Sequence, residues 1–344
     1  MTKLYSLGLG IGTQNSKGEW LEVFYPQPLL NPSESIVNAI VKALDYTGGN
    51  KAIQLTLEMA ANLRSALHEA GEGELAELCA TLRSSIRPAV ATLLESDEGP
   101  TSVPEGYLKL HLLSHRLVKP HGTNLTGLFG VLPNVAWTNR GAIDIEELPA
   151  RQLKARSRGR LLDVDCIDKF PKMTNYVIPK GVRIADTSRV RLGAHIGEGT
   201  TVMHEGFVNF NAGTLGTSMV EGRISSGVTV GEGSDLGGGC STMGTLSGGG
   251  NIVISVGKEC LIGANAGTGI PLGDRCIVES GLYITAGTKL TLLDDKNNAV
   301  ETVKARDLAG KNDLLFRRNS VTGGVECKTN KSAIALNDEL HKNN

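Results

Sequence analysis

Hydrophobic residues follow two different periods along this chain, and the change falls near residue 173. Before it, apolar positions either alternate, as on half-buried strands, or recur every three or four residues, as on amphipathic helices. These patterns predict a strand at 18–25 and helices at 33–45, with Ser33 as N-cap, 52–69, 72–95 and 107–118. We therefore expect an N-terminal α/β domain over residues 1–172.

Further along, an aliphatic residue returns every six positions. A six-residue aliphatic repeat is typical of a parallel β-helix, in which three hexapeptides close a triangular coil around inward-pointing aliphatic side chains. We expect a mainly β fold, with this β-helix over residues 173–292 and a C-terminal extension over 293–344 that ends in a helix at 331–341. The repeat runs through Ile178, Ile184, Val190, Ile196, Val202 and Val208, then Ile224, Val230 and Leu236, then Val256 and Ile262, and finally Leu272, Val278, Ile284 and Leu290.

The six-residue phase breaks twice, and we expect an inserted loop at each break, over residues 209–222 and 242–251. Insertions and flat faces are the surfaces that a solenoid offers for function. The first break ends in Glu221, with Arg223 close behind, whereas the second contains no ionisable residue. Acid–base chemistry is therefore expected at the first break.

Composition narrows the class of partner. The 35 basic and 36 acidic residues leave a formal net charge of −1, which excludes the broad basic field used to bind nucleic acid or anionic membranes. The sequence shows no signal-peptide pattern and no long apolar run, so we expect a cytoplasmic protein. The 43 glycines fit the tight corners of a β-helix, and the six cysteines are widely spread, which favours reduced, structural thiols.

Several long motifs resemble one enzyme family, the tetrahydrodipicolinate N-succinyltransferases, in the branch found in actinobacteria and pseudomonads. They are VMHEGFVNFNAGTLG at 202–216, MVEGRIS at 219–225, GSDLGGGCSTMGTLSGGG at 233–250 and LLFRRNS at 314–320, with LHLLSHRLVKPH at 110–121, PNVAWTN at 133–139 and DKFPKM at 168–173. The resemblance implies a homotrimer of left-handed β-helices with active sites between neighbouring subunits. It also implies succinyl transfer from succinyl-CoA to ring-opened tetrahydrodipicolinate, in lysine and diaminopimelate biosynthesis.

The same resemblance assigns roles to individual residues. It makes Glu221 the catalytic carboxylate, as a base or as a nucleophile that forms an acyl-anhydride, and we favour the base because water would destroy an anhydride. It places Mg²⁺ on the trimer axis at Glu205, although the accompanying acidic position is Ser188, which has no carboxylate. Acyl-CoA binding falls to Arg223, Gly238, Ser241, Ala264, Glu279, Ser280, Gly287, Lys304, Arg317, Arg318, Asn319 and Ser320. Of these, Lys304, Arg317 and Arg318 can pair with phosphates.

Other interpretations remain at this point. Another hexapeptide acyltransferase would use acetyl-CoA, with His195 or His204 as base, and a purely structural scaffold would give Glu221 no role. A carbonic anhydrase of this architecture needs three zinc-binding histidines, and the coil region has only two. His111 and His115 lack further metal ligands and are expected to form a core or interface pair. GLGIGT at 8–13 is not followed by the helix that a dinucleotide-binding loop requires.

Overall fold

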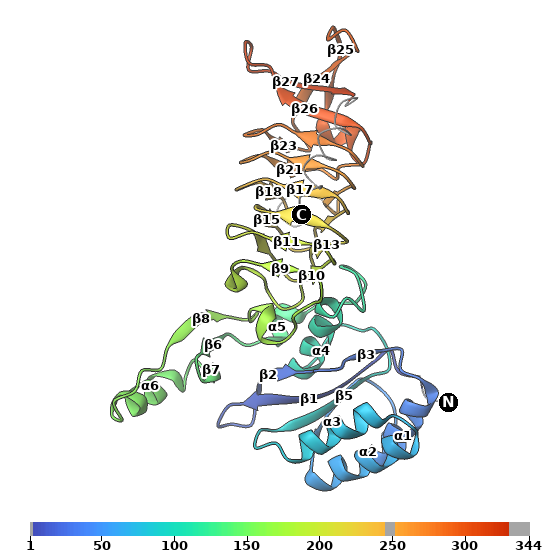
Figure 1. Cartoon of the computed structure of the whole chain (residues 1–344), viewed down its shortest axis with the longest axis vertical. Helices are drawn as coiled ribbons and strands as arrows, with labels where there is room; N and C mark the ends of the chain where they lie inside the picture. Colours follow the sequence, from blue (N-terminus) through green and yellow to red (C-terminus); the bar gives the residue numbers. More distant parts are fainter. Residues whose placement is uncertain (1–2, 245–251, 330–344) are drawn as a thin grey trace. The chain divides into compact units, whose positions relative to one another are not determined.

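The computed structural model describes residues 3–244 and 252–329 of the chain. The helix expected at 331–341 and most of the second phase break lie outside the described residues. The chain divides into two compact units (Figure 1). The N-terminal unit comprises Met1–Leu117, Gly122–Pro171 and Asn175–Val177, and the β-helix unit comprises Val118–His121, Lys172–Thr174 and Ile178–Asn344.

The N-terminal unit combines helices with two sheets. In chain order its elements are β1 (Ser6–Gln14), β2 (Trp20–Phe24), β3 (Leu29–Leu30), α1 (Glu34–Leu44), β4 (Lys51–Leu55), α2 (Leu57–Glu69), α3 (Gly73–Arg83), β5 (Ala89–Leu94), α4 (Val103–Ser114), α5 (Leu128–Val131), β6 (Val135–Thr138), β7 (Gly141–Asp144), α6 (Leu148–Arg156) and β8 (Val164–Asp168). The larger sheet has the order β2-β1-β5-β4, with β3 also paired to β1, and the smaller sheet has the order β7-β6-β8.

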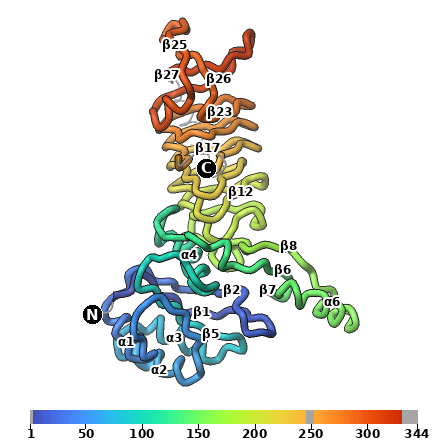
Figure 2. The backbone as a smooth tube through the Cα atoms, turned by 180° about the vertical axis from the view of Figure 1, so that it is seen from behind, coloured from blue at the N-terminus to red at the C-terminus, as the bar shows by residue number. Residues whose placement is uncertain are grey.

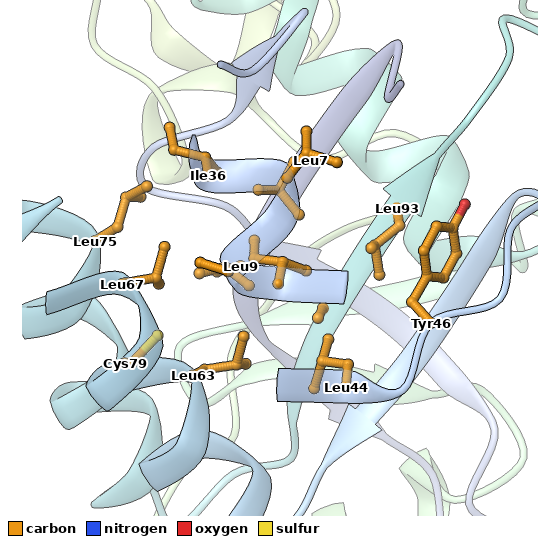
Figure 3. Close-up of a cluster of buried hydrophobic side chains, with 14 of the residues drawn as sticks. Leu7, Leu9, Ile36, Leu44, Tyr46, Leu63, Leu67, Leu75, Cys79 and Leu93 are labelled. Carbon is orange, nitrogen blue, oxygen red and sulfur yellow. The ribbon is translucent and has the colours of Figure 1, made fainter. Parts of the chain in front are cut away.

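The core of this unit lies between the larger sheet and helices α1–α3. Figure 3 shows Leu7 and Leu9 of β1 facing Leu63 and Leu67 of α2, all of them buried. The alternate β1 residues are glycines on the opposite face, where Tyr25 covers Gly8 and Gly10: a Cβ at Gly8 would lie 2.6 Å from the tyrosine ring. The glycines of GLGIGT thus belong to a strand under an aromatic side chain.

Two helix predictions for this unit are wrong in part. Residues 52–55 belong to β4, because Thr56 caps α2 through a hydrogen bond from the backbone N–H of Met59. The predicted helix at 72–95 ends at Arg83, and residues 89–94 form β5, the fully buried strand between β1 and β4. A short, continuous apolar run fits a buried strand and a buried helix equally well.

The other predicted elements of this unit lie close to their observed bounds. Helix α1 has Ser33 as N-cap, whose side chain accepts from the N–H of Ile36, and Asp45 as C-cap. The strand predicted at 18–25 is β2, and the helix predicted at 107–118 is α4, which begins and ends slightly earlier, at Val103 and Ser114. Periodicity located these elements, and the capping residues set their ends.

The β-helix unit consists of short parallel strands on three sheets, stacked coil upon coil (Figures 1 and 2). The first sheet contains β9 (Arg183–Ile184), β11 (Thr201–Val202), β14 (Ser218–Val220), β17 (Ser234–Leu236), β20 (Leu261–Ile262) and β22 (Ile277–Val278). The second contains β12 (Phe207–Val208), β15 (Arg223–Ile224), β18 (Ser241–Thr242), β21 (Gly267–Gly269) and β23 (Tyr283–Thr285). The third contains β10 (His195–Ile196), β13 (Gly213–Thr214), β16 (Thr229–Val230) and β19 (Ser255–Val256).

The predicted interior positions are buried from Val190 to Leu290, which confirms the repeat. Thr201 pairs with Arg183 on one side and with Met219 on the other, at equal separations along the chain, so a regular coil contains three hexapeptides. The first two positions are exceptions: Ile184, in the first strand of the stack, β9, is only partly buried, and Ile178, which precedes that strand, is 74% exposed. Three threonines, Thr214, Thr242 and Thr268, also occupy buried positions in this interior.

The first phase break is a deletion, and the expected insertion there is wrong. Thr201 pairs with Met219 at the regular spacing, but Phe207 pairs with Arg223, which comes earlier in the chain than that spacing requires. Thr214 and Val220 keep the six-residue phase, and the coil then closes early between Val220 and Ile224. The second break is a true insertion, because Asp235 pairs with Leu261, well beyond the length of one regular coil.

Part of the C-terminal extension pairs with the first sheet of the β-helix. Its strands are β24 (Lys289–Leu293), β25 (Ala299–Lys304), β26 (Leu314–Arg318) and β27 (Val325–Thr329). Strand β26 continues the first sheet in parallel to β22, with Val278 opposite Phe316. Phe316 is fully buried, so a late segment of the chain completes the end of the shaft.

Candidate functional site

Most of the predicted site residues lie along one edge of the β-helix, where strands of the first sheet turn into strands of the second. We call this the site edge; its corners are residues 185–189, 203–207, 221–223, 237–241, 263–267 and 279–283. Successive corners carry Ser188, Glu205, Glu221, Gly238 and Ser241, Ala264, and then Glu279 and Ser280. The coil repeat thereby aligns residues from distant parts of the sequence into one column.

Glu221 lies on the short corner, 221–223, which contains fewer residues than the corners before and after it. Its backbone N–H donates to the carbonyl of Leu236 at 2.8 Å, and its carbonyl accepts from the N–H of Gly239 at 3.3 Å. A Cβ at Gly238 would lie 3.5 Å from Oε2 of Glu221. The corner thus holds the glutamate backbone rigidly, and glycine on the next coil leaves room beside the carboxylate.

Cys240 is the sulfur group near this carboxylate, and it cannot serve as a nucleophile. Burial raises the pKa of the Cys240 thiol to about 12. Arg223 lowers this pKa slightly and Glu221 raises it slightly. A thiol with so high a pKa carries almost no thiolate near neutral pH. All six cysteines are free, and five of them are buried, with Cys166 exposed. Glu221 carries the carboxylate of this corner, the group expected to do acid–base chemistry.

Arg223 begins a ladder of side chains along the outer face of the second sheet. Its Nε donates to Oγ of Ser241 at 3.1 Å, and that Oγ shares a 3.2 Å hydrogen bond with the hydroxyl of Tyr283. Between them lies Gly267, where a Cβ would come within 2.3 Å of the Tyr283 ring. Tyr283 was missed by sequence reasoning, although it directly precedes an interior residue, as Arg223 and Ser241 do.

At the last corner, the β-helix meets residues of the C-terminal extension. The N–H of Glu279 donates to the carbonyl of Phe316, and Oε2 of Glu279 accepts from the N–H of Arg318 at 2.6 Å. The LLFRRNS motif is thereby fixed beside Glu279 and Ser280. This places Arg318, Asn319 and Ser320 close to the end of the site edge.

Arg317 does not extend freely from this segment. Its Nε donates to Oε2 of Glu326 at 2.9 Å, and Nδ2 of Asn319 donates to Oε1 of the same carboxylate at 2.7 Å. These donors lower the pKa of Glu326. Arg317 and Asn319 therefore brace the β26–β27 hairpin, and the guanidinium that was expected to pair with a phosphate already has a carboxylate partner.

A basic cavity of about 540 Å³ lies around Lys304. Lys289 and Lys304 are opposite each other in the β24–β25 register, and Arg306 adds a third cation, against the single carboxylate of Asp307. The turn that carries Gly287 lies alongside, because the N–H of Arg306 donates to the carbonyl of Ala286. The sequence motifs pointed to Lys304 and Gly287 but not to Lys289 and Arg306, which no linear motif joins to them.

The residues predicted for magnesium do not fit a metal site within one chain. Oγ of Ser188 donates to Oδ1 of Asp186 at 2.6 Å, and Glu205 is exposed, with Oε1 3.2 Å from Nδ1 of His204. Among residues 3–244 and 252–329, no three histidine, cysteine or acidic side chains lie together as metal ligands. Magnesium prefers several oxygen ligands, and a single carboxylate falls short of that requirement.

The two histidines of the alternative acyltransferase are placed differently from Glu221. His195 is buried, and its Nδ1 lies 2.9 Å from the carbonyl of Thr214, within the third sheet. His204 is exposed on the corner that precedes Glu221 along the site edge. His111 and His115 stack 6.0 Å apart in the N-terminal unit, and burial lowers the pKa of His111 to about 3. The described residues contain no helix long and apolar enough to cross a membrane.

The coil repeat and its site edge define a hexapeptide-repeat protein of the succinyltransferase type: residues 253–286 match the family model "Hexapeptide repeat of succinyl-transferase", and residues 132–172 match "Tetrahydrodipicolinate N-succinyltransferase middle". The second match covers β6–β8 and α6 of the N-terminal unit. The chain belongs to the tetrahydrodipicolinate N-succinyltransferase family, as full-length relatives show.

These relatives are named 2,3,4,5-tetrahydropyridine-2,6-dicarboxylate N-succinyltransferase. The chain is 67% identical to the protein of Pseudomonas paraeruginosa and 66% identical to that of Pseudomonas putida, in each case over 99% of both chains. It is 60% identical to the Vibrio cholerae protein, again over 99% of both. A crystal structure from Campylobacter jejuni, described as a 2,3,4,5-tetrahydropyridine-2-carboxylate N-succinyltransferase, is 35% identical with a TM-score of 0.89, covering 97% of this chain and 94% of that one.

Proposed function

We propose that this chain transfers the succinyl group of succinyl-CoA to the amino group of ring-opened tetrahydrodipicolinate, with Glu221 as the general base. The observation that carries the proposal is the placement of Glu221 on the short corner, next to Gly238, with further residues expected to bind acyl-CoA on the corners that follow, namely Ser241, Ala264, Glu279 and Ser280. Family membership supports the donor and the acceptor.

The reaction needs one proton acceptor at the attacking amine. The amine nitrogen attacks the thioester carbonyl, and Glu221 takes the proton that the nitrogen loses as the C–N bond forms. The tetrahedral intermediate then collapses, the C–S bond breaks, and the sulfur leaves and is protonated as the CoA thiol. Direct attack suits this corner better than an acyl-anhydride on Glu221, because the corner is partly open to water, which would hydrolyse an anhydride.

The donor is proposed to lie along the site edge and to reach toward the C-terminal extension. Gly238, Ala264 and Ser280 present small or absent side chains on successive corners, which leaves space for an extended pantetheine arm. Arg223 and Ser241 flank the same corners through their hydrogen bond. The phosphates would fall to the three cations of the Lys304 cavity and to Arg318, since ammonium and guanidinium groups bind phosphate oxygens strongly.

The assembly is also part of the proposal. We expect left-handed coils and a homotrimer whose neighbouring subunits complete each active site, as the family resemblance implies. Three copies of the exposed Glu205 would then approach the threefold axis, and magnesium would serve there only to offset their repulsion. No step of the transfer proposed above passes through a metal.

A panel of donors and acceptors tests the proposal directly. With the purified protein, thiol release is measured for succinyl-CoA and acetyl-CoA on tetrahydrodipicolinate, on L-serine and on a sugar nucleotide. Succinyl-CoA with tetrahydrodipicolinate should give a kcat/KM at least about a hundredfold above any other pair. A preference for acetyl-CoA would favour the alternative acyltransferase, and no release with any pair would remove the enzymatic assignment.

A further inference from the structure

The N-terminal unit contains a second cavity, of about 340 Å³, which the proposed succinyl transfer does not use. One wall comes from the hydrogen-bonded pair β1–β2, where Ile11 lies opposite Phe24 and Thr13 lies opposite Glu22. These four side chains share one face of the sheet because alternate residues of a strand point the same way. The remaining walls are residues of the smaller sheet, with Arg87, Asn175 and Tyr176.

A buried carboxylate forms the floor of this cavity. Glu22 is only 7% exposed, and it accepts hydrogen bonds from the hydroxyls of Thr13 at 2.5 Å and Tyr176 at 3.1 Å. Burial raises the pKa of Glu22, and the two hydroxyls and Arg87 counteract part of that effect. Burying a carboxylate costs stability, and groups of this kind concentrate at functional sites.

Arg87 lies close to this carboxylate and is held in place while it keeps N–H donors for a ligand. Its Nη1 donates to the Thr13 hydroxyl at 2.6 Å and lies 3.9 Å from Oε1 of Glu22. Gly141 makes room for the guanidinium, since a Cβ there would come within 3.3 Å of Nη2. A guanidinium has five N–H donors, so this anchored group retains a donor edge for a ligand carboxylate.

The rest of the cavity is suited to an apolar body and a positive charge. The indole of Trp137 is buried, and its Nε1 donates to the carbonyl of Asp168, which fixes the ring as a wall beside Phe24 and Ile11. Asp165 places a second carboxylate on the lining. A fixed guanidinium, an acidic wall and an aromatic surface together match the three parts of an α-amino acid.

We propose that this cavity binds a free α-amino acid with an apolar side chain, its carboxylate on Arg87, its ammonium toward Asp165 and Glu22, and its side chain against Trp137 and Phe24. The site lies wholly within the N-terminal unit. It is therefore separate from the site edge, and it stands or falls independently of the proposed succinyl transfer.

Trp137 provides the readout, because the chain has only two tryptophans. In a Trp20→Phe background, all indole fluorescence comes from Trp137, and the full-length protein is titrated with L-leucine. We expect a saturable change in emission. L-Leucinamide, which lacks the carboxylate, and isocaproate, which lacks the ammonium, should each bind at least about tenfold more weakly, because each leaves one charged partner in the site unpaired.

Variants separate the site from general effects on the fold. Arg87→Met in the same background should weaken L-leucine binding at least about tenfold, whereas Arg64→Met, which removes an exposed ion pair with Glu77, should not change it. Because Arg87→Met leaves Glu22 without its cation, Asp165→Asn on the exposed rim is tested as well and should weaken binding in the same direction. The proposal is overturned if L-leucine causes no saturable change, if L-leucinamide binds equally well, or if neither cavity variant weakens binding.

Discussion

The N-terminal unit buries several ionisable side chains in its interior, whereas the β-helix displays its candidate site residues along an exposed edge. Glu22 and His111 are each less than a tenth exposed, and burial moves the pKa of both toward the neutral form. On the site edge, Arg223 and Glu279 are exposed and Glu221 is only partly buried. The β-helix carries its stability in an aliphatic shaft, so its corners are free to vary for function. In the N-terminal unit, by contrast, a change to a buried polar group also changes the stability of the fold.

The largest expected effect is on the site edge. Glu221→Gln preserves the size of the side chain but removes the proton acceptor, so kcat should fall by about a hundredfold to ten-thousandfold while the melting temperature stays unchanged. Thiol release at saturating substrates measures it. Glu198→Gln, an exposed glutamate on another corner of the shaft, is the matched control and should retain normal turnover. Near-normal turnover of Glu221→Gln would show that Glu221 is not the general base.

The contrasting effect in the N-terminal unit is on stability and on its dependence on pH. The pKa of His111 is lowered from 6.5 to about 3, so the unfolded chain takes up a proton below about pH 6.5 that the folded chain excludes. The free energy of unfolding should therefore fall with decreasing pH, by up to about 1.4 kcal/mol per pH unit for this group. Thermal or urea unfolding between pH 7 and 5 should show a shallower pH dependence for His111→Gln and an unchanged one for the exposed His68→Gln. If His111→Gln and the parent protein had the same dependence of unfolding free energy on pH, His111 would not be the source of the effect.

The cationic cavity gives an effect on binding alone. Lys304→Met should raise the KM for succinyl-CoA about tenfold with little change in kcat, because one charge-assisted contact to a phosphate is lost. Lys328→Met is the control, since Lys328 is another lysine of the extension, hydrogen-bonded to Asn297. With 3′-dephospho succinyl-CoA, the difference between Lys304→Met and the parent protein should shrink if Lys304 contacts the 3′-phosphate. If Lys304→Met left the KM for both donors unchanged, the phosphates of the donor would not bind in this cavity.

A smaller effect tests the ladder on the second sheet. Tyr283→Phe removes the hydroxyl that bonds Ser241 but keeps the ring over Gly267, so KM for succinyl-CoA should rise about threefold to tenfold. Tyr283→Ala removes the ring as well and should raise KM further. Steady-state kinetics with both variants separates the two contributions. If both variants match the parent protein, the ladder has no part in donor binding.

The smallest expected effect concerns magnesium. Because Ser188 bonds Asp186 and provides no carboxylate, treatment with EDTA should leave the initial rate within about twofold of the untreated enzyme. Sedimentation before and after treatment shows whether the assembly depends on the ion. A large loss of turnover in an intact assembly would mean that the metal takes part in the transfer.

Sequence periodicity predicted the β-helix well because each coil repeats the same packing requirement. It misread the first break because Thr214 is polar and yet points inward, where its hydroxyl accepts from the N–H of Gly197. Because a polar residue at 214 does not register as an interior position, the aliphatic pattern stops after Val208, and a short deletion looks like a longer insertion. Likewise, the glutamate at 221 followed from its motif, but its place beside Gly238 depends on how the coils stack.

Other parts of the site could not be read from the sequence for a related reason. Tyr283 reaches Ser241 from a later coil, and Lys289 meets Lys304 only because β24 and β25 pair in one register. The partner of Arg317 is Glu326, a residue of the adjacent hairpin strand that no motif highlighted. Contacts between coils and across hairpins are set by register, which a one-dimensional pattern does not contain.

The return of β26 to the first sheet has a consequence for how the chain is made. Strand β22 is synthesised well before its partner β26, so its hydrogen-bonding edge stays open until the ribosome has released the segment around Phe316. Coils below it can stack as they emerge, each on the one before. An open, flat edge is a template for pairing with other chains. The last stage of synthesis is therefore the most vulnerable to aggregation, and it ends when β26 pairs with the edge of β22.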